Sequence, residues 1–111
     1  MEQMIELSSA DGGAITAYEA APEGRPKGAV VVLQEIFGLN RHIRKVARAY
    51  ASQGYLVVAP ALFHRVAPGI ELGYTPDDTT RGFALKTAAE ALLPALLGDL
   101  TGNCCLAPHR I

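Results

Sequence analysis

The sequence has only two cysteines and no long apolar run, and each shortage excludes a class of protein. The cysteines, Cys104 and Cys105, are adjacent, and neighbouring residues cannot reach relaxed disulfide geometry. No second cysteine or histidine pair stands at zinc-ligand spacing. No apolar run approaches the ~18 residues that a membrane span needs, and the acidic N-terminus does not resemble a signal peptide. We therefore expect a cytoplasmic protein with free thiols, no metal, no other cofactor and no membrane contact.

Excess charge of either sign is also absent, since 10 Lys+Arg stand against 11 Asp+Glu and the net charge is -1 at pH 7. Such a chain has no overall field that would attract nucleic acid or anionic lipid. One local basic cluster occupies the polar side of a predicted helix and consists of Arg41, His42, Arg44, Lys45 and Arg48. Aromatic residues are not interleaved with it, so we interpret the cluster as a solvated helix face and rank nucleic-acid binding last.

What the chain does contain suits a single domain, because 111 residues of which 50% are hydrophobic can bury a core. The N-terminal part predicts a β-hairpin. Ile5 and Leu7 alternate with polar neighbours, and residues 15–21 resume an extended pattern after the turn Asp11-Gly12-Gly13. Residues 22–28 are dense in turn formers and predict a surface connection rather than a linker between domains.

A strand, a helix and a second strand follow within about 30 residues. Residues 29–33 form a continuous β-branched run, which is typical of a strand covered on both faces at the centre of a parallel sheet. Helical spacing then extends from Asn40, a predicted N-cap, to Gly54, a predicted C-terminal stop. The next apolar run, residues 55–59, is stopped by Pro60. This length and order predict a right-handed βαβ unit with parallel strands.

A loop rich in proline, glycine and tyrosine precedes a second predicted helix. Asp77 or Asp78 is its predicted N-cap, and its apolar face would consist of Leu85, Ala88, Ala89, Leu92 and Leu93. Pro94 should kink or end this helix, and residues 94–111 have no clear period and no run long enough for a buried strand. We therefore expect a partial α/β domain over residues 1–93 and an irregular C-terminal tail over 94–111.

One acidic residue stands where open α/β sheets bind ligands. Glu35 follows the first parallel strand directly, so its side chain should project from the carboxyl end of that strand. The simpler alternative is an ion pair between Glu35 and Arg41 or Arg44 of the following helix.

The residues around Glu35 resemble the dienelactone hydrolase family over approximately residues 5–90. The most diagnostic stretch is Gln34-Glu35-Ile36-Phe37-Gly38-Leu39-Asn40, followed at the family's spacing by Gln53-Gly54-Tyr55 and by Ala59-Pro60-Ala61-Leu62-Phe63. Ala61 departs from the family, in which this position commonly holds Asp. The resemblance implies the N-terminal part of an α/β-hydrolase fold, with a β-hairpin, a parallel βαβ unit, a further helix and an incomplete sheet.

The resemblance also implies hydrolysis of carboxylic ester or lactone bonds of a small molecule by a Cys-His-Asp triad, whose cysteine lies in a G-x-C-x-G elbow. It gives Glu35 the role of tuning the nucleophilic thiol and the backbone N–H of Ile36 that of an oxyanion-hole donor. Arg81 matches, within one residue of register, the arginine with which such enzymes bind a substrate carboxylate. The alternative for Arg81 is an exposed charge near a helix start.

Other candidates for the triad match poorly. Gly102-Asn103-Cys104-Cys105-Leu106 has the first glycine of an elbow, but leucine replaces the second and no β-branched strand precedes it. His109 has only two residues after it. We expect His42 on the polar helix face and His64 at the rim of the sheet, where it could line a pocket.

Two interpretations of function remain open. The first is a hydrolase of the dienelactone hydrolase family, truncated or shifted in reading frame near residue 93, inactive alone, and with an open sheet edge through which it could self-associate. The second is a non-catalytic small α/β module that binds a ligand or a partner chain.

Overall fold

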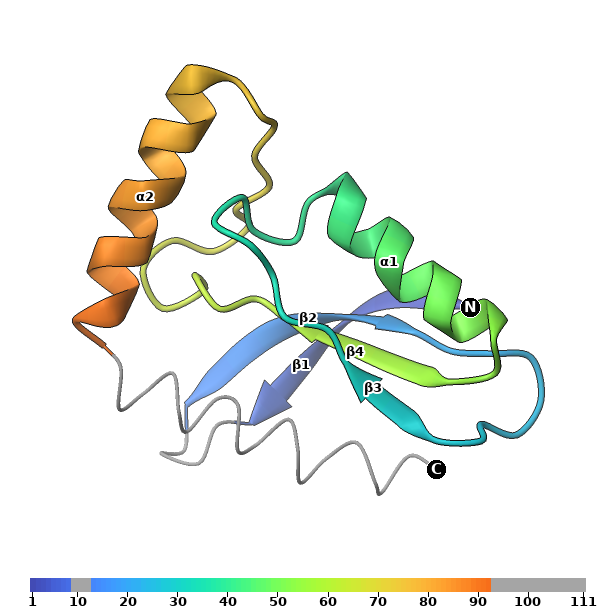
Figure 1. Cartoon of the computed structure of the whole chain (residues 1–111). Helices are drawn as coiled ribbons and strands as arrows, with labels where there is room; N and C mark the ends of the chain where they lie inside the picture. Colours follow the sequence, from blue (N-terminus) through green and yellow to red (C-terminus); the bar gives the residue numbers. More distant parts are fainter. Residues whose placement is uncertain (9–12, 93–111) are drawn as a thin grey trace.

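The computed structural model describes residues 1–8 and 13–92, which form one sheet with a helix across one face and a second helix beside it (Figure 1). Four strands make up the sheet: β1 (Glu2–Ser8), β2 (Ala14–Ala20), β3 (Ala29–Val31) and β4 (Leu56–Pro60), in the order β1-β2-β4-β3. The helices are α1 (Arg41–Ser52) and α2 (Pro76–Glu90). The predicted mixed α/β class is confirmed.

The strand pairings confirm both the hairpin and the βαβ unit. β1 pairs with β2 antiparallel, from Glu2 opposite Ala20 to Ser8 opposite Ala14. β3 and β4 are parallel, with Val30 opposite Val57, and α1 connects them. β2 also pairs with β4, in antiparallel orientation, so the hairpin and the βαβ unit share one sheet.

The strand at the centre of the described sheet is β4, and the placement of residues 29–33 at the centre is wrong for this part of the chain. All five residues of β4 are buried, whereas the three residues of β3 are only partly buried. Among the described residues β3 pairs with β4 alone. β-Branched residues prefer strands in general, so a run of them does not distinguish a central strand from an edge strand.

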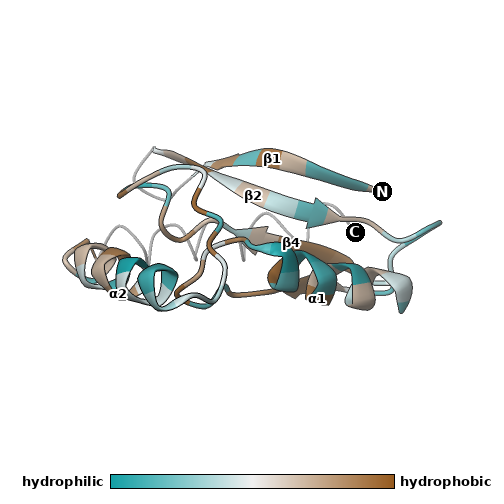
Figure 2. Ribbon diagram, turned by 90° about the horizontal axis from the view of Figure 1, so that it is seen from above, coloured by the Kyte–Doolittle hydropathy of each residue, from teal (hydrophilic) through white to brown (hydrophobic). Residues whose placement is uncertain are grey.

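Helix α1 begins and ends where the sequence predicts. The Oδ1 of Asn40 accepts a hydrogen bond from the backbone N–H of Ile43 at 3.2 Å, and Gly54 has a φ of +97° just after the helix. Ile43 and Ala47 are buried in a cluster with strand residues that include Tyr18, Val57 and Ala59. Figure 2 shows the hydrophobic colouring of β4 next to hydrophilic stretches of α1, as expected for an amphipathic helix on a sheet.

Helix α2 is capped by Thr75 and not by either aspartate. The hydroxyl of Thr75 accepts a hydrogen bond from the N–H of Asp78 at 3.1 Å, and Pro76 occupies the first helical position, where its missing N–H costs nothing. Asp77 and Asp78 are thereby placed in the first turn, where their charge is favourable to the helix dipole.

The buried face of α2 is also narrower than predicted and consists of Gly82, Leu85 and Ala89. Ala88 and Leu92 are exposed, and Leu93 lies outside the described residues. Leu85 and Ala89 pack with Phe63 and Leu72 of the loop after β4 instead of on the sheet. Helix α2 therefore packs on connecting segments and not on the sheet.

The predictions for Pro94, Cys104, Cys105, His109 and the tail 94–111 concern residues outside the described part of the chain. Within the described part, no helix is long and apolar enough to cross a membrane. No group of three or more histidine, cysteine, aspartate or glutamate side chains there is arranged to hold a metal ion.

Candidate active site

The candidate site is built on the turn that follows β3. The N–H of Gly38 donates to the carbonyl oxygen of Glu35 at 3.3 Å, and Gly38 has a φ of +78°, which favours glycine. The side chain of Gln34 fixes the start of this turn, because its Oε1 accepts from the N–H of Leu62 at 2.9 Å. This hydrogen bond thus connects the segments that follow β3 and β4, next to Glu35.

Glu35 and Ile36 line a cavity of about 280 Å³ between the ends of these two strands and α2. Its lining residues are Gln34, Glu35, Ile36, Leu62, Phe63, Lys86, Ala89 and Glu90. Among the described residues, the carboxylate of Glu35 forms no hydrogen bond or ion pair, and the backbone N–H of Ile36 has no acceptor. An acidic group and a backbone donor are therefore both available at one mostly apolar cavity.

The alternative partners for Glu35 are engaged elsewhere or exposed. Arg44 donates to the Oε1 of Glu71 at 2.5 Å and to the carbonyl oxygen of Leu39 at 3.1 Å, so its predicted pairing with Glu35 is wrong. Arg41 is exposed on α1, and no ion pair joins it to Glu35 within the described part of the chain. The hydrogen bond from Arg44 lowers the pKa of Glu71, and burial of that carboxyl opposes this only in part.

The segment of residues 70–74 packs against the turn that follows β3. The N–H of Leu72 donates to the carbonyl oxygen of Phe37 at 2.9 Å, and the rings of Phe37 and Tyr74 meet edge to face at 4.6 Å between centroids. Gly38 lies against the backbone carbonyl of Ile70, so closely that a side chain could not be accommodated there. These contacts hold Glu35 and Ile36 in a defined backbone conformation.

Helix α2 approaches the site through Gly82. A Cβ at this position would come within 2.6 Å of the carbonyl oxygen of Ile36. The contributions of Gly82, Gln34 and Lys86 were not predicted from the sequence. A signal was available for Gly82 alone, since an isolated glycine within a helical pattern indicates close packing.

Arg81 is exposed on α2 and does not line the cavity, so its role in carboxylate binding stays a prediction. The cation that does line the cavity is Lys86, which forms an exposed ion pair with Glu90 at 3.6 Å. His64 is half-buried, with Nδ1 3.5 Å from the hydroxyl of Thr16, and His42 is exposed on α1. Neither histidine lines this cavity.

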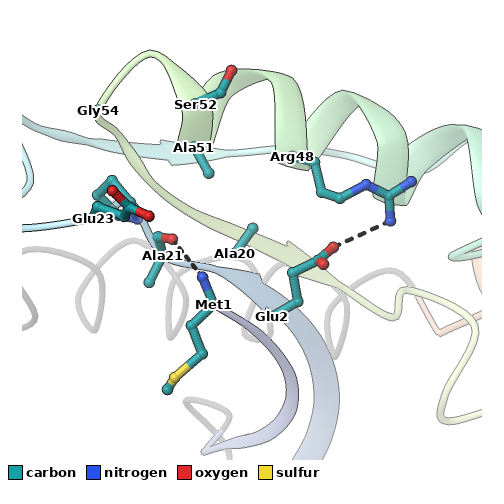
Figure 3. A pocket seen from close by; sticks show the side chains of 10 residues that line it. Met1, Glu2, Ala20, Ala21, Glu23, Arg48, Ala51, Ser52 and Gly54 are labelled. Atoms are coloured by element: carbon teal, nitrogen blue, oxygen red, sulfur yellow. Dashed lines mark hydrogen bonds and ion pairs between the residues drawn. The ribbon is translucent and has the colours of Figure 1, made fainter.

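A second, larger recess of about 500 Å³ lies between the hairpin and the end of α1 (Figure 3). Two pairs of polar groups in its lining are already bonded. The N-terminal amine of Met1 donates to the carbonyl oxygen of Ala21 at 3.0 Å, and Arg48 forms an ion pair with Glu2 at 3.1 Å. Because Arg44 and Arg48 are both engaged in ion pairs, part of the basic cluster connects α1 to other elements and is not a free cationic patch.

Comparison with known proteins identifies the family of the chain. The family profile of the dienelactone hydrolase family matches residues 15–99. A carboxymethylenebutenolidase from Pseudomonas putida is 34% identical over 106 residues, which cover 96% of this chain and 44% of that protein. A Synechocystis protein described as a carboxymethylenebutenolidase is 44% identical over 78 residues, covering 70% of this chain and 31% of that protein.

The fold is shared with a solved relative as well. The crystal structure of a Klebsiella pneumoniae protein described as a dienelactone hydrolase has 31% sequence identity and a TM-score of 0.70, over 98% of this chain and 45% of that chain. The 111 residues thus span less than half the length of each of these relatives. By its sequence and its fold, the chain belongs to the dienelactone hydrolase family.

Proposed function

We propose that the described residues form the oxyanion-binding and thiol-tuning part of a hydrolase that acts on carboxylic ester or lactone bonds of small molecules. The observation that carries this proposal is the presence of Glu35 and the N–H of Ile36 at one cavity, both without a partner among the described residues. Family membership supports the reaction class.

The two groups have complementary tasks in such a reaction. When a cysteine thiolate attacks the acyl carbon, the carbonyl oxygen becomes negatively charged, and the N–H of Ile36 can donate a hydrogen bond to it. A carboxylate beside the thiol accepts a hydrogen bond from the S–H and disfavours a second negative charge nearby. Glu35 would thus keep the thiol protonated until the substrate is in place.

We further propose that the 111 residues assayed alone have no family-level hydrolase activity. The sequence contains no G-x-C-x-G segment, and only Glu35 and Ile36 have positions that match catalytic roles. Members of a catalytic triad act as a unit, and loss of the nucleophile or the base removes several orders of magnitude of rate. Turnover of a dienelactone by the purified chain that disappears in Cys104→Ser would contradict this proposal.

A chimera tests the role of the site itself. Residues 1–92 are joined to the remaining C-terminal part of the Pseudomonas putida carboxymethylenebutenolidase, and hydrolysis of a dienelactone and of an activated aryl ester is measured. We expect turnover by the chimera and a loss of kcat/KM by about 10²-fold or more in Glu35→Gln. Glu23→Gln, at an exposed position outside this cavity, is the matched control. A folded chimera whose activity is the same with Glu35→Gln would contradict the proposal.

The edge of the sheet favours a second function, association with another copy of this chain. The hydrogen bonds Leu56 N–H to Gly28 O and Val32 N–H to Val58 O, both 3.0 Å, show which backbone groups of β3 face β4. By alternation, the backbone groups of Ala29 and Val31 point to the opposite side, and Leu33, two residues beyond the strand, is 52% exposed.

Such an edge can pair with a second strand. We expect dimers or larger species at micromolar concentration by sedimentation velocity, and a shift to monomer in Val31→Pro, which removes an outward N–H and no hydrogen bond to β4. A wild-type chain that is monomeric at all concentrations would contradict this second function.

A further inference from the structure

We propose that Asn40 is a positioning residue that holds the 70–74 segment against the turn carrying Glu35 and Ile36. The inference rests on the proposed function only in giving those two residues a catalytic role. The contact between this segment and Asn40 is made by two hydrogen bonds of the Asn40 side chain, and neither is needed to cap the helix.

The side chain of Asn40 connects two parts of the chain. It is 4% exposed, and its Oδ1 accepts from the N–H of Ile43 at the start of α1. Its Nδ2 donates in the other direction, to the carbonyl oxygen of Leu72 and to the hydroxyl of Tyr74, at 3.2 Å each. One buried amide therefore joins the first turn of α1 to a segment more than 30 residues later.

Both backbone polar groups of Leu72, its N–H and its carbonyl oxygen, form hydrogen bonds. The N–H of Leu72 donates to the carbonyl oxygen of Phe37, within the turn that carries Glu35 and Ile36. The carbonyl oxygen of Leu72 accepts from Asn40, which follows that turn. The ring of Tyr74 contacts the ring of Phe37 while its hydroxyl accepts from Asn40. Loss of the Asn40 donors would remove two of the hydrogen bonds that keep this segment beside the turn.

Asparagine is suited to this position because its short side chain has an acceptor for the helix cap and two N–H donors for the segment. Aspartate caps a helix equally well but has no donor, and its charge would face the Leu72 carbonyl oxygen. Serine caps a helix but cannot reach two further acceptors. Asn40→Asp therefore keeps the helix cap and removes the two hydrogen bonds to the 70–74 segment.

The experiment is amide hydrogen exchange by NMR on the full 111-residue chain. In Asn40→Asp we expect exchange at Leu72 to accelerate about tenfold, the loss of roughly one hydrogen bond, while Ile43 and Val58 stay as in the wild type. The backbone resonance of Ile36 should shift as well. Thr75→Ala, which removes the α2 cap only, is the control and should leave Leu72 exchange unchanged.

Tyr74→Phe provides a second test in case Asn40→Asp does not fold. It removes one acceptor and keeps the ring on Phe37, so we expect faster exchange at Leu72 by a smaller factor. The proposal is overturned if Leu72 exchange is unchanged in the variant that folds, or if it accelerates only together with Val58, which would indicate global destabilisation. A folded chimera whose activity is unchanged in Glu35→Gln would overturn the proposed function without affecting this result.

Discussion

The carbonyl oxygen of Ile36 lies against Gly82 of α2, where a Cβ would approach it to 2.6 Å. The close approach exists because Gly82 has no side chain. Since the other buried residues of α2, Leu85 and Ala89, pack against a loop, Gly82 decides how near the helix comes to the turn that carries Glu35 and Ile36. The glycine, which costs helix stability by itself, is thus explained by the geometry of the site.

Gly82→Ala should destabilise the protein although alanine is the better helix former. The gain in propensity is about 1 kcal/mol, but the methyl group meets backbone atoms of Ile36 that cannot move independently of the turn. We expect a net loss of about 1–2 kcal/mol in the free energy of unfolding, measured by urea denaturation. The control Ala84→Gly, at an exposed position, should lose about 1 kcal/mol from propensity alone. Stabilisation by Gly82→Ala would show that α2 is not held at this distance.

Gly38→Ala should cost more than Gly24→Ala, although the two glycines have nearly the same φ, +78° and +74°. A Cβ at Gly24 meets nothing within 4 Å, whereas a Cβ at Gly38 collides with the carbonyl of Ile70. Gly24→Ala should therefore lose only the ~1 kcal/mol of left-handed strain, and Gly38→Ala at least ~2 kcal/mol. Equal losses in chemical denaturation would contradict the close packing of the turn against the 70–74 segment.

The Arg44–Glu71 ion pair should contribute to stability in a pH-dependent way. The hydrogen bond from Arg44 lowers the pKa of Glu71 in the folded state below its usual 4.5. The contribution is therefore complete above that value and is lost as the pH falls through the lower, folded pKa. The side chains are 29% and 52% exposed, so solvent screening limits the contribution to about 0.2–1 kcal/mol.

Urea denaturation of Glu71→Gln at several pH values tests this. The variant should be less stable than the wild type at pH 7 and should approach it at about pH 3. Glu23→Gln, a change outside any ion pair of the described residues, should stay within about 0.5 kcal/mol. A Glu71→Gln deficit that is constant with pH would exclude the ion pair as its cause.

Ile36→Pro should remove the proposed oxyanion donor from the catalytically complete chimera. Proline has no backbone N–H, and removal of one oxyanion-hole donor typically costs about 10²–10³ in kcat. Ile36→Val keeps the N–H and most of the apolar contact, so it should lower kcat less than about threefold. An Ile36→Pro chimera with normal kcat would show that Ile36 does not stabilise the oxyanion.

The sequence by itself determined the elements whose signals are local. The hairpin strands follow from alternation on either side of a glycine-rich segment, although Asp11 and Gly12 of the predicted turn lie outside the described residues. Helix α1 follows from helical spacing after Asn40. The parallel βαβ unit follows from the order and lengths of its parts, since the connection hardly permits another arrangement. The position of Glu35 beyond the carboxyl end of the first parallel strand was predictable for the same reason, although β3 ends at Val31 and Glu35 lies in the turn after it.

Only the tertiary structure decided how these elements and the intervening loops meet. It placed β4 and not β3 at the centre of the described sheet, paired Arg44 with Glu71, and gave Asn40 partners at Leu72 and Tyr74. Residues brought together across 27 to 34 positions of sequence leave no periodic pattern along the chain. Their proximity is fixed by the packing of a loop and of α2 around one turn, and so the geometry around Glu35 and Ile36 could not be predicted from the sequence.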